Sequence, residues 1–131
     1  MLLANGLKMS NQKNAIFYQG NFKKDGSKNR GWFVGTFMSG LQKTELMEIK
    51  FYRSDAMKNH PAKISQTLEL TMVIKGYQKG FILDREIEIK AGEYVIIPPG
   101  VKNNLILECS DDLEALTVKV PSDPTAKSIV Q

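Results

Sequence analysis

Short runs with the character of β-strands, each closed by turn residues, dominate the sequence from residue 31 onward. The runs are rich in β-branched and aromatic residues and are separated by turns that contain Gly, Pro, Asp or Ser. No segment keeps the i, i+3, i+4, i+7 spacing of apolar residues that a long amphipathic helix requires. We therefore expect an antiparallel sandwich or barrel. The eight runs span residues 31–38, 45–53, 68–74, 77–83, 86–90, 94–98, 103–108 and 113–120.

At 131 residues the chain has the length of one domain, which can bury its own core without disulfides. The sequence predicts a barrel domain over residues 31–131 and an irregular, basic N-terminal arm over residues 1–30. Residues 1–8 also fit an upstream extension, because Met9 would serve as an alternative start. The opening apolar run is too short for a secretory signal, and no run approaches the roughly 20 apolar residues of a membrane span. We therefore expect a cytoplasmic protein that does not bind membranes.

The formal net charge of +4 is unevenly distributed and does not predict nucleic-acid binding. Residues 1–63 hold 11 Lys and Arg against 4 Asp and Glu, whereas residues 64–131 hold 7 against 10. A surface for nucleic acid would interleave Arg with stacking aromatic residues along one face. Here the basic residues of 23–30 gather in a Gly-, Asn- and Ser-rich segment, which is typical of a solvated connection. No nucleic-acid partner is therefore expected.

Two motifs on either side of a predicted hairpin are similar to the signature of a known family. The first is a glutamate followed after six residues by a glycine, from Glu69 to Gly76, and the second is Gly-x5-Pro-x-Gly, from Gly92 to Gly100. The glycines suit turns that need a positive φ, and the proline ends a strand because it lacks a backbone donor. In this pattern the chain resembles the cupins over residues 45–127. The resemblance implies an all-β fold, an antiparallel β-barrel built as a double-sheet jelly roll.

The resemblance also implies a site where cupins commonly hold a metal ion with three histidines and one glutamate. Aligned on the two motifs, those positions become His60, Ala62, Glu69 and Asn103, with Asn104 pointing outward. Alanine has no donor atom, and an amide oxygen is a weak ligand for transition metals. We therefore expect no cofactor. The alternative is a divalent transition metal held by His60, Glu69 and Asn103.

Without a metal, Glu69 becomes the central residue of the site. If it points into the barrel, Thr71 and Val73 share its face, and the carboxylate must be paired, hydrogen-bonded or protonated. Asn103 would then donate to it and His60 would pair with it, which gives a site for a small polar ligand or an acid–base pair. In the other interpretation Glu69 is solvated near the barrel mouth, and His60, in a polar loop before a proline, lies on the surface.

Three functions stay open at this stage. The preferred one is a small-molecule-binding protein of unknown substrate, with ligand-binding residues His60, Glu69, Asn103 and Thr71 and with its catalytic residues, if any, unknown. The second is a metal-dependent cupin enzyme of the dioxygenase or isomerase type. The third is a structural or interaction barrel whose interior is filled by side chains.

The run over residues 68–74 predicts that something covers one face of the sheet. If Glu69 faces inward, the four residues that alternate with its face point outward, and all of them are apolar, unlike a strand that faces solvent. Either the run at 31–38 or a second copy of the chain must cover them, and a homodimer is expected, as small cupins often dimerise. The four residues are Leu68, Leu70, Met72 and Ile74.

Overall fold

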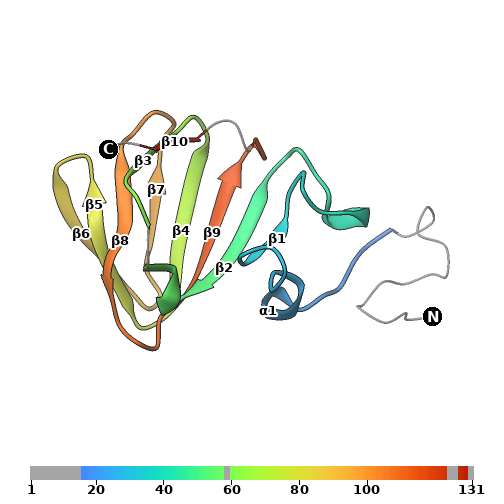
Figure 1. Ribbon diagram of the computed structural model, residues 1–131, viewed down its shortest axis with the longest axis horizontal. Helices are drawn as coiled ribbons and strands as arrows, with labels where there is room; N and C mark the ends of the chain where they lie inside the picture. The colour runs from blue at the N-terminus through green and yellow to red at the C-terminus, as the bar shows by residue number, and fades with distance from the viewer. Residues whose placement is uncertain (1–15, 58–59, 124–126, 130–131) are drawn as a thin grey trace.

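The computed structural model describes residues 16–57, 60–123 and 127–129, and it contains two antiparallel sheets of five strands each (Figure 1). The first sheet has the order β1 (Trp32–Val34), β2 (Glu48–Arg53), β9 (Glu114–Val120), β4 (Leu68–Lys75) and β7 (Tyr94–Ile97). The second has the order β10 (Lys127–Ile129), β3 (Lys63–Ser65), β8 (Asn103–Cys109), β5 (Tyr77–Ile82) and β6 (Arg85–Lys90). This architecture confirms the predicted all-β, double-sheet fold.

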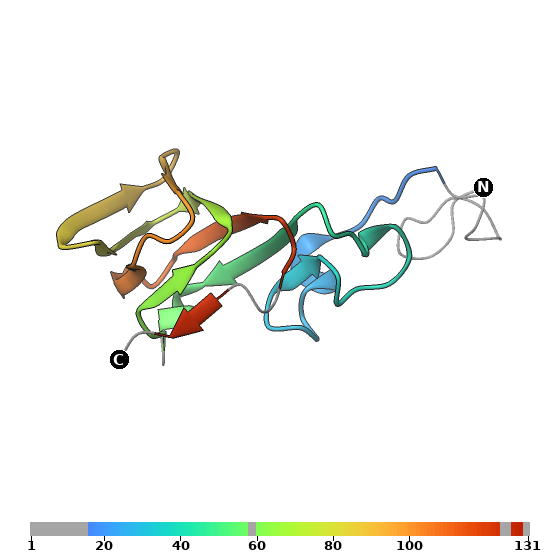
Figure 2. The same ribbon diagram turned by 90° about the horizontal axis from the view of Figure 1, so that it is seen from above.

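Helical structure is confined to three short segments in the described part of the chain, and none of them could span a membrane. They are α1 (Phe22–Asp25), η3 (Gly40–Gln42) and η4 (Ser54–Met57). Figure 2 shows α1 and β1 together at one end of the molecule, away from the β5–β6 hairpin. The predicted domain boundary at residue 30 stays a prediction, since residues 1–15 lie outside the described ranges.

The short helix α1 is held on the outer side of β2 by aromatic packing. Asn21 begins the helix because its side-chain oxygen accepts a hydrogen bond from the backbone N–H of Lys24 at 3.0 Å. The Phe22 ring then lies 4.8 Å from the ring of Phe51 and 6.0 Å from that of Phe33, measured between centroids. The segment that follows α1 is thereby fixed beside the first sheet.

The alternation on β4 follows the prediction. Glu69, Thr71 and Val73 are buried, whereas Leu68 and Ile74 on the opposite face are 42% and 46% exposed. Since successive side chains of a strand point to opposite faces, the polar pair Glu69 and Thr71 must face the interior.

The interior of the barrel is filled with apolar side chains at one end and left polar at the other. On β2 the polar face points inward, because Lys50 pairs across the sheet with Thr117 of β9 and Tyr52 pairs with Ala115. The filled end holds a cluster of Val73, Ile89, Ile106, Leu113 and Ala115. This arrangement leaves room for a polar cavity at the end near α1 and β1.

Candidate functional site

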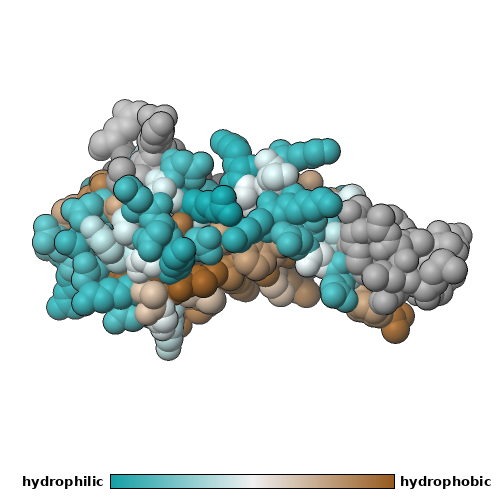
Figure 3. Space-filling view, turned by 90° about the horizontal axis from the view of Figure 1, so that it is seen from below, coloured by the Kyte–Doolittle hydropathy of each residue, from teal (hydrophilic) through white to brown (hydrophobic). Residues whose placement is uncertain are grey.

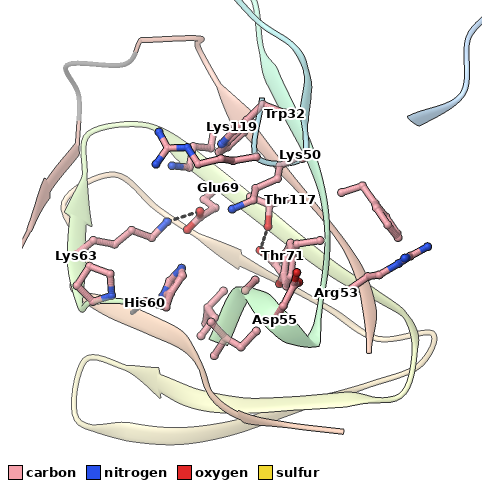
Figure 4. A pocket seen from close by; sticks show the side chains of 18 of the residues that line it. Trp32, Lys50, Arg53, Asp55, His60, Lys63, Glu69, Thr71, Thr117 and Lys119 are labelled. Carbon is pink, nitrogen blue, oxygen red and sulfur yellow. Dashed lines mark hydrogen bonds and ion pairs between the residues drawn. The ribbon is translucent and has the colours of Figure 1, made fainter. Parts of the chain in front are cut away.

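A cavity of about 670 Å³ lies between the sheets and is closed on one side by the segment from α1 to β1. All four predicted ligand-binding residues line it, namely His60, Glu69, Thr71 and Asn103, although ligand binding by them stays a prediction. Its wall is strongly charged, as Figure 4 shows. The charged lining residues are Lys23, Arg30, Lys50, Arg53, Asp55, Lys63, Glu69 and Lys119.

The centre of the cavity is an ion pair between β3 and β4. The ammonium of Lys63 donates to Glu69 Oε1 at 2.5 Å, and the two side chains are 9% and 4% exposed. Glu69 is therefore neither solvated nor paired with the groups expected from the sequence. Lys63 was missed because a lysine in a polar segment between a loop and a three-residue strand has no distinguishing sequence pattern.

Two buried acceptors at this pair have no hydrogen-bond partner among the residues that the structure describes. They are Glu69 Oε2 and Asn103 Oδ1, on side chains whose residues are 3% and 2% exposed. The expectation that Asn103 donates to Glu69 is wrong, since the Asn103 amide donates to the carbonyl of Val101 at 3.1 Å. Buried acceptors are nearly always satisfied in folded proteins, so these two oxygens call for a donor that enters the cavity.

Two further cations of the cavity contact the same aromatic ring, the indole of Trp32. Lys119 Nζ lies 5.3 Å from the centroid of the Trp32 ring, and Lys50 Nζ lies 5.6 Å from it. Such distances are those of cation–π contacts, which favour an ammonium over the face of the ring. In Figure 4 Lys50 and Lys63 point toward Glu69 from different walls of the cavity. The sequence signal for Lys50 and Lys119 is their position on the polar, inward faces of two alternating strands.

The floor of the cavity is formed by neutral hydroxyl groups. The hydroxyls of Thr71 and Thr117 lie 2.8 Å apart, and Tyr52 donates to Gln78 Oε1 at 2.7 Å. Burial raises the pKa of Tyr52 above its ordinary value, against the lowering effect of its hydrogen bonds with Gln78 and Thr117. The phenol therefore stays protonated and acts as a donor.

His60 reaches the cavity wall, but its hydrogen-bonded neighbour is Asn104. Its Nδ1 lies 3.1 Å from Asn104 Oδ1, and the Asn104 amide donates to the His60 carbonyl at 3.0 Å. The expectation that Asn104 points outward is therefore wrong, because this side chain is buried and fastens the loop before β3 to β8. His60 becomes a wall residue held in place by that contact.

The position of β3 moves the alignment with the cupin histidine pair by three residues, from His60 and Ala62 to Lys63 and Ser65. The inward-facing, buried residues of β3 are Lys63 and Ser65, which have the spacing of the family's histidine pair, whereas His60 and Ala62 precede the strand. Lys63 is also the cross-strand partner of Asn103. On this alignment the positions that the resemblance implies are Lys63, Ser65, Glu69 and Asn103, of which Lys63, Glu69 and Asn103 line the cavity.

This donor set does not fit a metal ion. In the described ranges no three side chains of His, Cys, Asp or Glu are grouped so that they would hold one. The single carboxylate of the set is that of Glu69. Its Oε1 atom already accepts a hydrogen bond from the positively charged ammonium of Lys63. An ammonium has no lone pair to offer a metal, and a serine hydroxyl is a weak ligand.

Comparison with solved structures identifies the fold. A cupin of the RmlC-like, double-stranded β-helix type from Methanocaldococcus jannaschii matches with a TM-score of 0.52 and 28% identity, over 60% of this chain and 73% of that protein. An uncharacterised double-stranded β-helix protein from Klebsiella pneumoniae matches with a TM-score of 0.54 and 15% identity, over 67% of this chain and 77% of its own.

An enzyme is also among the structural neighbours. The DMSP lyase DddQ from Ruegeria pomeroyi matches with a TM-score of 0.53 and 13% identity, over 67% of this chain and 45% of the lyase. The chain thus spans less than half of that protein, and the likeness concerns the fold. No protein-family profile and no curated protein sequence matches the chain.

Proposed function

Because this chain has the double-sheet fold of the cupins, we propose that its cavity binds a small organic molecule and does so without a tightly bound metal ion. One observation carries the proposal: Glu69 Oε2 and Asn103 Oδ1 are buried acceptors without partners in the described ranges of the chain, and they lie at a cavity large enough for such a molecule. Cavities of a few hundred Å³ with a small number of placed polar groups are the usual form of ligand sites. A barrel with only a structural role would have no need of unsatisfied acceptors at its centre.

Ligand binding is tested by thermal unfolding with a panel of anionic, neutral and cationic small molecules. At least one class is expected to raise the melting temperature, because a ligand that binds only the folded state stabilises it. In the Asn103→Leu variant, which removes the amide oxygen, that increase is expected to disappear. Lys79→Met on the outer, exposed part of β5 serves as the control and is expected to respond like the parent protein. A panel without effect in any class would contradict the proposal.

The absence of a functional metal is tested by elemental analysis of untagged protein purified without chelator. We expect less than about 0.1 transition-metal ion per chain, because the site offers a single uncoordinated carboxylate oxygen and no histidine pair. The matched control is Lys63→His, Ser65→His and Asn103→His together, which restores the ligand types of the family and is expected to bind nickel or zinc. A stoichiometric metal in the parent protein would instead favour a metal-dependent enzyme.

We further propose that two copies of the chain pair through the outer face of the first sheet. This face is apolar across three neighbouring strands, and two of its residues, Tyr94 and Ile96, are 63% and 53% exposed. Figure 3 shows apolar residues gathered along one margin of the molecule, opposite a hydrophilic side. An exposed apolar sheet face suits a twofold interface, in which the same surface of both copies is buried. The face comprises Leu68, Leu70, Met72, Ile74, Tyr94, Ile96, Leu116, Val118 and Val120.

Light scattering on a sizing column is expected to give a mass of twice 14.7 kDa. Ile96→Glu would place a charge in the middle of the interface and is expected to yield a monomer. Leu107→Glu is the control, because Leu107 is 49% exposed but lies on β8 of the other sheet, and this variant should stay dimeric. A monomeric parent protein at micromolar concentration would contradict the pairing.

A further inference from the structure

Lys63 connects two other buried polar side chains of the cavity, those of Glu69 and Asn103. Its ammonium donates to Glu69 Oε1 at 2.5 Å and so reaches from β3 of one sheet to β4 of the other, as the dashed line in Figure 4 shows. Its Cα is opposite that of Asn103 in the pairing of β3 with β8. Since both residues are buried, their side chains leave the backbone next to each other on the inward face. We call these three residues the Lys63 cluster.

The Lys63 cluster contains two acceptors that no described residue satisfies, Glu69 Oε2 and Asn103 Oδ1. The orientation of the Asn103 amide follows from its nitrogen, which donates to the carbonyl of Val101 at 3.1 Å. The reverse orientation would bring two oxygen atoms together, so the oxygen is the atom that lacks a partner. A ligand that occupies the space beside the cluster must therefore present at least two hydrogen-bond donors.

The cluster also contains hydrogen-bond donors. A lysine ammonium has three N–H groups, and within the described ranges the hydrogen bond of Lys63 goes to Glu69 Oε1. The other N–H groups call for an acceptor, so the ligand must accept from Lys63 as well as donate to its neighbours. The charges of Lys63 and Glu69 offset each other, and the pair therefore calls for no net charge on the ligand.

A charged ligand group meets these requirements poorly. A carboxylate or phosphate accepts from Lys63, but it repels the carboxylate of Glu69 and its ionised oxygens have no hydrogen to donate. An ammonium donates to both acceptors, but it repels Lys63 and offers it no lone pair. A hydroxyl group donates and accepts at one uncharged atom. Two hydroxyl groups on one molecule therefore satisfy both acceptors and Lys63 together.

We infer that the ligand is an uncharged polyol, a small molecule with two or more hydroxyl groups, held by Lys63, Glu69 and Asn103. This inference rests on the proposed function and names the ligand class of the same cavity. One hydroxyl donates to Glu69 Oε2 and another to Asn103 Oδ1, and Lys63 donates to a hydroxyl oxygen.

An uncharged ligand also agrees with the contacts of other cations in the cavity wall. Lys23 Nζ lies 3.4 Å from Glu114 Oε2, and the ammonium groups of Lys50 and Lys119 lie over the ring of Trp32. These three cations therefore have favourable contacts within the protein itself, and an anionic ligand is not needed to stabilise them.

The ligand class is tested by isothermal titration calorimetry. The polyol probes are glycerol, D-ribose, D-glucose and myo-inositol. The comparison probes are cationic D-glucosamine, anionic D-glucuronate, cyclohexanol with its single hydroxyl, and nicotinamide as an uncharged amide. We expect at least one polyol to bind about tenfold or more tightly than every comparison probe, because each comparison probe leaves a buried group unsatisfied or adds a charge. Its affinity should change less than about twofold as salt is raised.

Two variants locate the binding of that polyol. Asn103→Leu removes one acceptor and is expected to weaken binding about tenfold or more. Lys63→Met together with Glu69→Leu removes the rest of the cluster and leaves no unpaired charge, so this variant is expected to fold and to lose binding. Lys79→Met, a half-exposed lysine of β5, is the control and should leave the affinity unchanged.

The possible results separate the two proposals. If a comparison probe binds as tightly as the best polyol, or if a charged member of the thermal-unfolding panel binds and no polyol does, the ligand class is wrong while small-molecule binding stands. If a polyol binds both cluster variants as tightly as the parent protein, it binds elsewhere and the inference fails. If none of these probes and no member of the wider panel binds, small-molecule binding itself fails.

Discussion

Replacing Lys63 by methionine is expected to lower the free energy of unfolding by about 4 kcal/mol. The reason is the charge that the substitution leaves behind: Glu69 is 3% exposed, and its partner oxygen would lose the bond to the ammonium at 2.5 Å. A buried carboxylate without a counter-charge is among the most destabilising groups a single substitution can create. Urea unfolding followed by circular dichroism measures the change in free energy.

Two further variants make this expectation specific to the ion pair. The double variant Lys63→Met with Glu69→Leu removes both charges and is expected to recover most of the lost stability, because replacing a whole buried pair by apolar residues is often neutral. Lys79→Met, which removes a lysine from surface pairs with Glu88 and Glu108, is expected to change stability by less than about 0.5 kcal/mol. If the single Lys63 variant is as stable as the surface variant, the pair does not exist in solution.

Replacing Gly80 by alanine is expected to lower the free energy of unfolding by about 3 kcal/mol and to weaken ligand binding. A Cβ at this position would overlap the carbonyl oxygen of Asn104 and would crowd the backbone of Leu105. Backbone atoms of a paired strand cannot move aside as a side-chain end can, so β8 itself must shift. Because β8 begins with Asn103, the shift displaces an acceptor of the site.

Gly92→Ala provides the comparison for this effect. Gly92 has a φ of +89°, and a Cβ there would meet no atom within 4 Å. The substitution therefore introduces backbone strain alone, about 1–2 kcal/mol, and it leaves β8 in place. Urea unfolding and the ligand-dependent shift of the melting temperature should both separate the two variants. Equal losses of stability and binding in both would show that the close approach at Gly80 is unimportant.

The strands were predictable where hydrophobic alternation extends over several residues. The predicted runs 68–74 and 77–83 correspond to β4 and β5, and the alternation in the first also identified its inward face. The strand β3 was not predicted, because its three residues include one apolar side chain, Ile64, and its position depends on pairing with β8 and β10. Short strands of this kind are determined by tertiary contacts rather than by local sequence.

The site was predictable in part, for the same reason. Glu69 and Asn103 were found because they lie at fixed spacings from glycine and proline residues, Glu69 before Gly76 and Asn103 after Gly100, that mark the ends of strands. Lys63 was not found, since the short strand that carries it was not found. The loop residue His60 was aligned in its place, and only the structure shows that its hydrogen-bonded neighbour is Asn104.

The positive charge of a lysine side chain differs from that of a bound metal ion, because the lysine is part of the chain. The ammonium of Lys63 is joined to the backbone by four methylene groups, so no chelator can extract it and no other ion can displace it. It also has no accessible oxidation states, in contrast to iron or manganese. The positive charge beside Glu69 is therefore present whatever metals the surroundings supply, and mutation or chemical modification of the lysine removes it.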